Sequence, residues 1–173
     1  MTSLSGWLLV GRGSEQRIVL IAHHNETGAF GICLNDASDT SWEQVFGDDI
    51  AAAVKQNPIF IGGPDKEDKP WVLHPVVPDI AFENSLELGA AQLTLSLDGL
   101  SVAASGDFGA LARIGFGVYT WQPGELEASV SDNKDWQIIP ASDAILFSIG
   151  QDRLYETCVQ VADALAKKMA DQS

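Results

Sequence analysis

Three histidines and one glutamate are the side chains best suited to metal or acid–base chemistry in this chain of 173 residues. His23, His24 and Glu26 lie in one short segment, and His74 follows later. Two imidazoles and a carboxylate form a ligand set that suits zinc. Adjacent strand residues point to opposite faces, however, so His23 and His24 would share an ion only if the strand ended between them. We therefore expect strand-end histidines bonded to the backbone, with no metal and no cofactor.

A glycine-rich turn, Gly62-Gly63-Pro64, is the second candidate site. Free backbone amides in such a turn could cradle an anion, as backbone nests do. The Lys and Ser/Thr of a P-loop are missing, and Asp65 follows at once, which opposes phosphate. We therefore expect a tight turn with glycines at positive φ.

Trp121, Glu125 and Glu127 form the third candidate. Two carboxylates can do acid–base work when burial leaves a proton on only one of them. The interpretation that we favour is solvated acids in the first turn of a helix, where they complement the helix dipole. Asn35, at a predicted strand end, is expected to cap a turn through its side chain.

The candidate ligand-binding set is therefore His24, Asn35, Gly62, Gly63, His74, Trp121 and Glu125. No residue is assigned a catalytic role, because the sequence carries no GxSxG elbow and no HExxH motif.

The elements that must position these residues are a mixture of strands and helices. The apolar run from Arg17 to His23 predicts a buried strand, and turn residues lead into a second strand over 29–34, so a hairpin is expected. Leu93 to Leu97 alternates with period two and predicts a half-buried strand. Thr40 and Glu43 predict a capping box before a short helix that ends near Phe46.

Other segments complete the predicted order of elements. Strands are expected at 6–10, 58–61, 71–74, 113–120 and 135–139, with a charged loop at 65–69. Helices are expected at 48–56, after Pro123 at a first helical position, and at 152–169, where apolar residues form one stripe ending at Met169. Because strands and helices do not alternate regularly, the pattern predicts a single α+β domain over residues 1–173.

The charge balance restricts the possible partners. Ten Lys and Arg oppose 24 Asp and Glu, which gives a formal net charge of −14. Binding to nucleic acid needs a basic patch, and a field of this sign repels DNA, RNA and anionic membranes. The apolar runs are shorter than the roughly 20 residues that span a bilayer, and the start lacks a basic signal-peptide region. Cys33 and Cys158 are expected to be buried thiols, so a cytoplasmic location is predicted.

Four segments, in order, resemble the YqgE/AlgH family of bacterial proteins. They are Gly28-Ala-Phe-Gly-Ile-Cys-Leu-Asn35, Ile61-Gly-Gly-Pro64 with Leu73-His74, Gly117 to Trp121 with Pro123-Gly-Glu-Leu-Glu127, and Trp136 to Pro140 with Ile145-Leu-Phe147. The resemblance implies a branched, curved, mostly antiparallel sheet that forms a barrel-like body with flanking helices and a C-terminal helix. It implies no established catalytic residue.

Some positions depart from the family pattern. Glu125 stands where relatives usually carry Gln, Asp65 replaces a usual Val, and Thr120 replaces a usual Gly. A family-wide binding role that depends on an amide at position 125 is therefore not transferred to this chain.

Three classes of function follow from these observations. The leading hypothesis is a non-enzymatic binding or regulatory module that acts through protein contacts, with apolar patches near Trp42, Trp71 and Trp121. The alternative is a small-molecule or metal-binding protein, or an enzyme, with a pocket near the Gly-Gly-Pro turn. The third is a DNA-binding transcriptional regulator, which the charge opposes. The sequence leaves the oligomeric state open.

Overall fold

The computed structural model describes residues 3–12, 16–47, 50, 57–76, 85–88, 91–105, 112–131, 136–142 and 144–171. Contacts within the chain divide it into two compact units. The first comprises Met1–Asn35 with Thr120–Ser173, and the second comprises Asp36–Tyr119. The single domain expected over 1–173 therefore stays a prediction.

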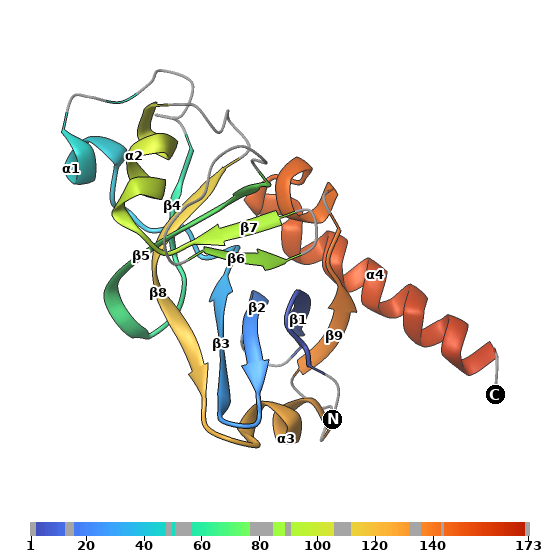
Figure 1. Cartoon of the computed structure of the whole chain (residues 1–173). Coiled ribbons are helices and arrows are strands. Elements are labelled where there is room, and N and C mark those ends of the chain that lie inside the picture. The colour runs from blue at the N-terminus through green and yellow to red at the C-terminus, as the bar shows by residue number, and fades with distance from the viewer. Residues whose placement is uncertain are drawn as a thin grey trace. The chain divides into compact units, whose positions relative to one another are not determined.

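The first unit contains an antiparallel sheet in the order β3-β2-β1-β9 (Figure 1). Its strands are β1 (Trp7–Gly11), β2 (Ile18–Asn25), β3 (Gly28–Cys33) and β9 (Trp136–Pro140). The predicted hairpin is confirmed as β2 and β3, which are joined through Glu26 and Thr27. Four consecutive residues of β2, Ile18–Ile21, are fully buried, as the continuous apolar run indicates.

Helical segments complete the first unit. They are α3 (Glu125–Ser131), the π-helix η2 (Ala144–Ser148) and α4 (Gln151–Asp171). The C-terminal helix is confirmed, and α4 contacts β1, β2 and β9 while burying Leu154, Cys158 and Ala162. The predicted apolar stripe is not buried at its last residue, because Met169 is 72% exposed. Pro123 precedes α3 by two residues, so its predicted place at the first helical position is wrong.

The second unit contains a sheet in the order β6-β7-β5-β8, in which each strand is antiparallel to its neighbour. Strand β4 also pairs with β8, and this pair is parallel. Its strands are β4 (Ile59–Ile61), β5 (Asp65–Pro75), β6 (Ser85–Leu88), β7 (Ala91–Thr94) and β8 (Arg113–Trp121), whose last two residues belong to the first unit. The helices α1 (Trp42–Phe46) and α2 (Leu97–Ser105) contribute Trp42, Leu100 and Ala103 to a core with Ile59, Val72, Ala112 and Ile114. The α+β class and the mostly antiparallel pairing are confirmed.

Two predicted segments of the second unit are wrong in their bounds. The strand expected over Leu93–Leu97 ends at Thr94, and Leu97 begins α2. Because every residue of β7 is buried, the alternation in this segment does not report a half-buried strand. The charged segment expected as a loop is the exposed first half of β5, with an irregular register against β8 between Asp65 and Pro70. The helix expected over 48–56 lies outside the described residues apart from Ile50.

The start of α1 and the environments of two tryptophans also differ from expectation. Ser41, not Thr40, caps α1, and its capping box closes with Gln44, not Glu43.

Trp42 and Trp71 are 2% and 0% exposed, so the apolar patches expected beside them are wrong. Each indole N–H donates to a backbone carbonyl, of Asn57 at 2.7 Å and of Gly117 at 3.0 Å. These bonds allow the polar end of each ring to be buried.

Cys33 and Cys158 are buried and neither is in a disulfide, as predicted. Among the helices of the described residues, none combines the length and the apolar character needed to cross a membrane.

Candidate functional site

The β2–β3 hairpin places His24 in the interior of the first unit. The register of the two strands shifts between Ile21 and His23, and His24 then pairs with Ala29. Such irregularities re-aim the side chains beside them. His23 is exposed and its ring lies against Phe30, with centroids 6.2 Å apart. His24 is 6% exposed, so the expectation that these two histidines point to opposite faces is confirmed.

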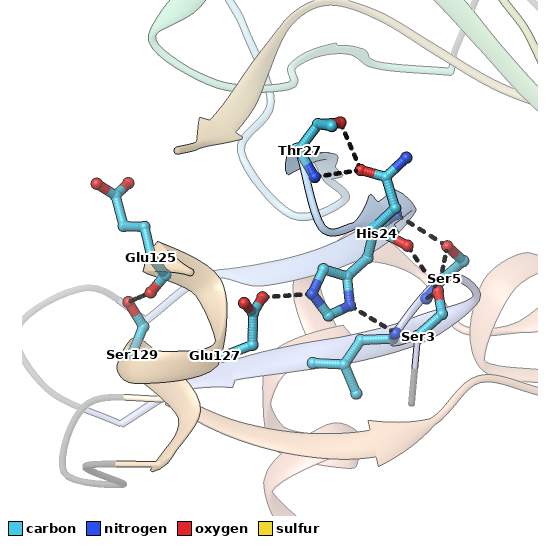
Figure 2. Close-up of polar contacts among 9 residues, drawn as sticks. Ser3, Ser5, His24, Thr27, Glu125, Glu127 and Ser129 are labelled. Atoms are coloured by element: carbon cyan, nitrogen blue, oxygen red, sulfur yellow. Dashed lines mark hydrogen bonds and ion pairs between the residues drawn. The ribbon is translucent and has the colours of Figure 1, made fainter. Parts of the chain in front are cut away.

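Both ring nitrogens of His24 have partners (Figure 2). The backbone N–H of Leu4 donates to Nδ1 at 2.9 Å. A nitrogen that accepts a hydrogen bond carries no proton, so the ring proton of the neutral imidazole lies on Nε2. Nε2–H donates to Oε1 of Glu127. The backbone bond expected for a strand-end histidine is therefore present, together with a carboxylate partner.

Glu127 reaches His24 because α3 is held close to the hairpin. Gly28 closes the β2–β3 turn with φ +135°, and a Cβ there would lie 2.6 Å from the backbone oxygen of Trp121 at the end of β8. Only glycine fits such a close approach at positive φ. The buried Leu126 then anchors α3, and Glu127 points toward His24 while Glu125 points away from it (Figure 2).

A cavity of about 420 Å³ lies beside this pair. Its lining residues come from the N-terminal segment, the hairpin turn and α3, and they are Ser3, His24, Asn25, Glu26, Thr27 and Glu127. The side chain of His24 is 4% exposed and that of Glu127 is 23% exposed. Oε1 of Glu127 accepts the His24 proton, and Oε2 accepts no hydrogen bond from the described residues, so Oε2 is the less engaged carboxylate oxygen.

This arrangement suits binding better than proton transfer by His24. A general base must have a lone pair within hydrogen-bond reach of the proton that it removes. The lone pair of Nδ1 is occupied by the Leu4 amide, and the Nε2 proton is donated to Glu127. The hydrogen bond from His24 therefore orients the carboxylate of Glu127.

Asn35 and the two glycines of the predicted set bond to or pack against backbone. Asn35 Oδ1 accepts the Ile18 N–H at 2.9 Å, and its Nδ2 donates to the Gln16 carbonyl at 2.9 Å. A Cβ on Gly62 or Gly63 would lie 2.2 Å from backbone atoms of β8. Neither glycine is at positive φ, so the expected turn with glycines at positive φ is wrong. The close packing against β8 explains why both positions are glycine. The Gly62 amide donates to Phe116 O at 2.8 Å and is not free for an anion.

His74 is fully buried in the second unit, and both of its ring nitrogens are bonded. Nδ1 lies 2.8 Å from the Pro75 carbonyl, which can only accept, so Nδ1 carries the proton. Nε2 accepts from the Thr94 hydroxyl at 2.8 Å. Burial lowers the pKa of His74, while the hydrogen bond to Pro75 opposes that shift. The described residues that line the cavity all belong to the first unit, whereas His74 belongs to the second.

The last two predicted residues lie close to the cavity in sequence but do not line it. Trp121 is half-buried at the end of β8, and Glu125 is exposed at the start of α3. Of the predicted ligand-binding set, the structure brings only His24 to the cavity. Within the described ranges, no group of three or more His, Cys, Asp or Glu residues could hold a metal ion.

Sequence patterns did not indicate Ser3, Asn25 and Thr27 as site residues. Asn25 and Thr27 are among the residues expected to form the hairpin turn, and Asn25 Oδ1 accepts from the Thr27 amide at 2.8 Å and hydroxyl at 2.6 Å. The partnership of His24 with Glu127 joins residues 103 positions apart. No local spacing could have indicated it.

Comparison with known proteins agrees with this fold. Residues 9–165 match the family model described as AlgH-like. The chain is 35% identical over 139 residues to the UPF0301 protein AlgH of Pseudomonas aeruginosa, covering 78% of this chain and 72% of that protein. A UPF0301 protein of Bordetella petrii is 29% identical over 148 residues, covering 83% and 72%. The chain therefore belongs to the AlgH-like family, and the resemblance of the four segments is confirmed.

Solved structures show the same relationship. The solution structure of AlgH from Pseudomonas aeruginosa matches with a TM-score of 0.74 at 30% identity, covering 92% of this chain and 89% of that chain. The crystal structure of a Corynebacterium diphtheriae protein matches with a TM-score of 0.69 at 22% identity, covering 90% and 85%. At that identity the second likeness concerns the fold alone.

Proposed function

We propose that this protein is a non-enzymatic binding module, and that the cavity beside His24 and Glu127 receives a group from its partner. The observation that carries the proposal is the pairing of the buried His24 with the half-buried Glu127, which presents one oriented carboxylate to a cavity of about 420 Å³. Ligand pockets commonly measure roughly 300–1,000 Å³ and fix their ligands with a few placed polar groups.

The occupied nitrogens of His24 favour binding over catalysis. Using His24 as a base would require breaking the bond from the Leu4 amide or displacing Glu127. Either change leaves a buried polar group unpaired, which costs about 1–3 kcal/mol. A fixed, hydrogen-bonded carboxylate is better suited to holding a ligand than to shuttling a proton.

Charge supports a protein or small-molecule partner over nucleic acid. The net charge of −14 repels polyphosphates and attracts cations. Two buried cysteines that are not in a disulfide, Cys33 and Cys158, agree with a reducing compartment. The proposed module is therefore cytoplasmic and acts through contacts with a basic partner.

A fragment screen by two-dimensional amide NMR tests the proposal. We expect some fragments to shift the amide signals of Asn25, Glu26, Thr27 and Glu127 as one group. The variant Thr27→Tyr places a ring at the mouth of the cavity and should abolish these shifts. Thr40→Tyr is the matched control, since Thr40 is also exposed but lies in the second unit. The proposal fails if no fragment shifts these signals, or if Thr27→Tyr leaves the shifts unchanged.

A further inference from the structure

We infer that the group bound in this cavity is a primary ammonium, carried by a small amine or by a lysine side chain. The inference rests on the proposed function and specifies its ligand. It follows from three features of the lining residues: the acceptors of their hydrogen-bond donors, their charges, and the hydrogen bond from His24 to Glu127.

The hydroxyl and imidazole protons of the lining are donated within the protein. The Ser3 hydroxyl donates to the His24 carbonyl at 2.9 Å, and the Thr27 hydroxyl donates to Asn25 Oδ1 at 2.6 Å. The Nε2 proton of His24 goes to Glu127. One proton of the Asn25 amide is donated to His23 Nε2 at 2.9 Å, which leaves its second proton as the spare side-chain donor.

Acceptor oxygens therefore dominate the side chains that face a ligand. Thr27 Oγ1 and Oε2 of Glu127 keep lone pairs, and Glu26 adds a second carboxylate at the exposed turn. Carboxylates and hydroxyl oxygens of this kind need a ligand that donates several hydrogen bonds. The ligand is accordingly rich in N–H or O–H groups and poor in acceptors.

The charges of the lining select a cation among such donors. Glu26 and Glu127 are acidic, and the described lining residues include no Lys or Arg. Hydrogen bonds between a cation and a carboxylate are roughly twice as strong as those between neutral groups. An anionic ligand would meet two negative charges and no Lys or Arg among the described lining residues.

His24 distinguishes an ammonium from a guanidinium. A guanidinium binds a carboxylate best through two parallel hydrogen bonds, one to each oxygen. Oε1 of Glu127 already accepts Nε2–H of His24, so a guanidinium that bonds to both oxygens must share Oε1 with that proton, while Oε2 accepts no hydrogen bond from the described residues. An ammonium is a compact donor that needs one carboxylate oxygen and can share its other protons with hydroxyl oxygens. The geometry thus disfavours the guanidinium.

Three probes with the same alkyl chain test this specificity by NMR titration. They are n-butylammonium, n-butylguanidinium and n-butanol, followed at the amide signals of Thr27 and Glu127. We expect the ammonium to bind about tenfold or more tightly than the alcohol, because its bonds to carboxylate are charge-assisted. We also expect it to bind several-fold more tightly than the guanidinium. Equal affinity of the ammonium and the alcohol, or tighter binding of the guanidinium, would overturn the inference.

Two variants assign the effect to one carboxylate. Glu127→Gln keeps an oxygen that accepts the His24 proton but removes the charge, and it should weaken n-butylammonium binding about tenfold. Glu125→Gln removes the same charge from an exposed residue of the same helix that does not line the cavity. It should change the affinity less than twofold. Equal losses in both variants would show a general charge effect and overturn the inference.

The results separate this inference from the proposed function. If neutral fragments occupy the cavity and show no preference for an ammonium, the inference fails and the binding module stands. If neither fragments nor amines reach it, both fail. Among amines, comparing putrescine with a lysine capped at both ends distinguishes a free metabolite from a protein side chain as the source of the ammonium.

Discussion

His23 and His24 are adjacent, yet their side chains have different roles. His23 is exposed and its Nε2 accepts from the Asn25 side chain, while His24 accepts a backbone amide and donates to a carboxylate in a largely buried setting. The difference follows from the alternation of a strand, which sends neighbours to opposite faces. His24 consequently connects the N-terminal segment, β2 and α3.

Replacing each histidine by phenylalanine measures this difference. His24→Phe leaves the buried Leu4 amide and the Glu127 carboxylate without their partner, and should lower the free energy of unfolding by about 2 kcal/mol. His23→Phe should change it by less than about 0.5 kcal/mol, as is usual for an exposed site. Urea denaturation followed by circular dichroism gives both values. Similar losses in the two variants would contradict the assigned role of His24.

A second prediction for a single side chain concerns the reactivity of the Cys158 thiol. Burial raises the pKa of this thiol to about 11. At pH 8 only about one molecule in a thousand then carries the reactive thiolate. In a Cys33→Ala background, an aromatic disulfide reagent should label Cys158 far more slowly in buffer than in urea. Rapid labelling of the folded protein at pH 8 would show that the thiol is accessible.

Among the elements, α1 shows how a cap decides where a short helix begins. Thr40 and Ser41 are adjacent hydroxyl residues, and each is followed three residues later by Glu or Gln. The helix begins at Trp42 because the Ser41 hydroxyl accepts the Gln44 amide, and the Gln44 side chain accepts the Ser41 amide at 2.7 Å. This register also puts Trp42 into the core of the second unit.

The cap can be located by paired alanine substitutions. Ser41→Ala should lower the free energy of unfolding by about 1 kcal/mol, because a capping hydroxyl is lost. Thr40→Ala lies one residue earlier and should have an effect of less than about 0.5 kcal/mol. Chemical denaturation of both variants gives the comparison. A larger loss for Thr40→Ala would place the cap one residue earlier, as the sequence pattern suggested.

For the whole molecule, burial of His74 links stability to pH. Burial lowers the pKa of His74 below its ordinary value of 6.5, so the unfolded chain takes up a proton that the folded chain resists. The free energy of unfolding should therefore fall as pH drops below about 6.5. In His74→Gln, whose amide oxygen can accept from Thr94, the fall between pH 7.5 and 5.5 should be smaller. Urea denaturation across this range measures it, and equal pH dependence would exclude His74 as the cause.

The net charge predicts how the molecule behaves toward DNA. With a formal charge of −14, the protein should not shift a DNA duplex at low salt up to about 100 μM, where cationic proteins already bind non-specifically. An electrophoretic mobility-shift titration tests this, with a basic DNA-binding protein as the positive control. Tight, salt-sensitive binding would overturn the charge argument and favour a DNA-binding regulator.

Local patterns in the sequence predicted much of the secondary structure and the α+β class. The β2–β3 hairpin follows from an apolar run with turn residues after it, and α4 follows from apolar residues spaced three and four apart. Both patterns depend on neighbours within one element. The prediction was wrong at the α1 cap because two adjacent hydroxyl residues each offered a capping box. It was wrong at Leu97 because the alternation over 93–97 does not mark where the strand ends, and β7 ends at Thr94 before α2 begins at Leu97.

The sequence by itself determined the charge, the family and the suitability of His24 as a site residue. Only the tertiary structure decided what His24 does, since its partners Leu4 and Glu127 lie 20 and 103 positions away in the chain. The close approach of Gly28 to Trp121 places the hairpin against the chain that leads into α3, and residues of both line the cavity. Such contacts depend on backbone packing between distant segments, which no spacing within the sequence records.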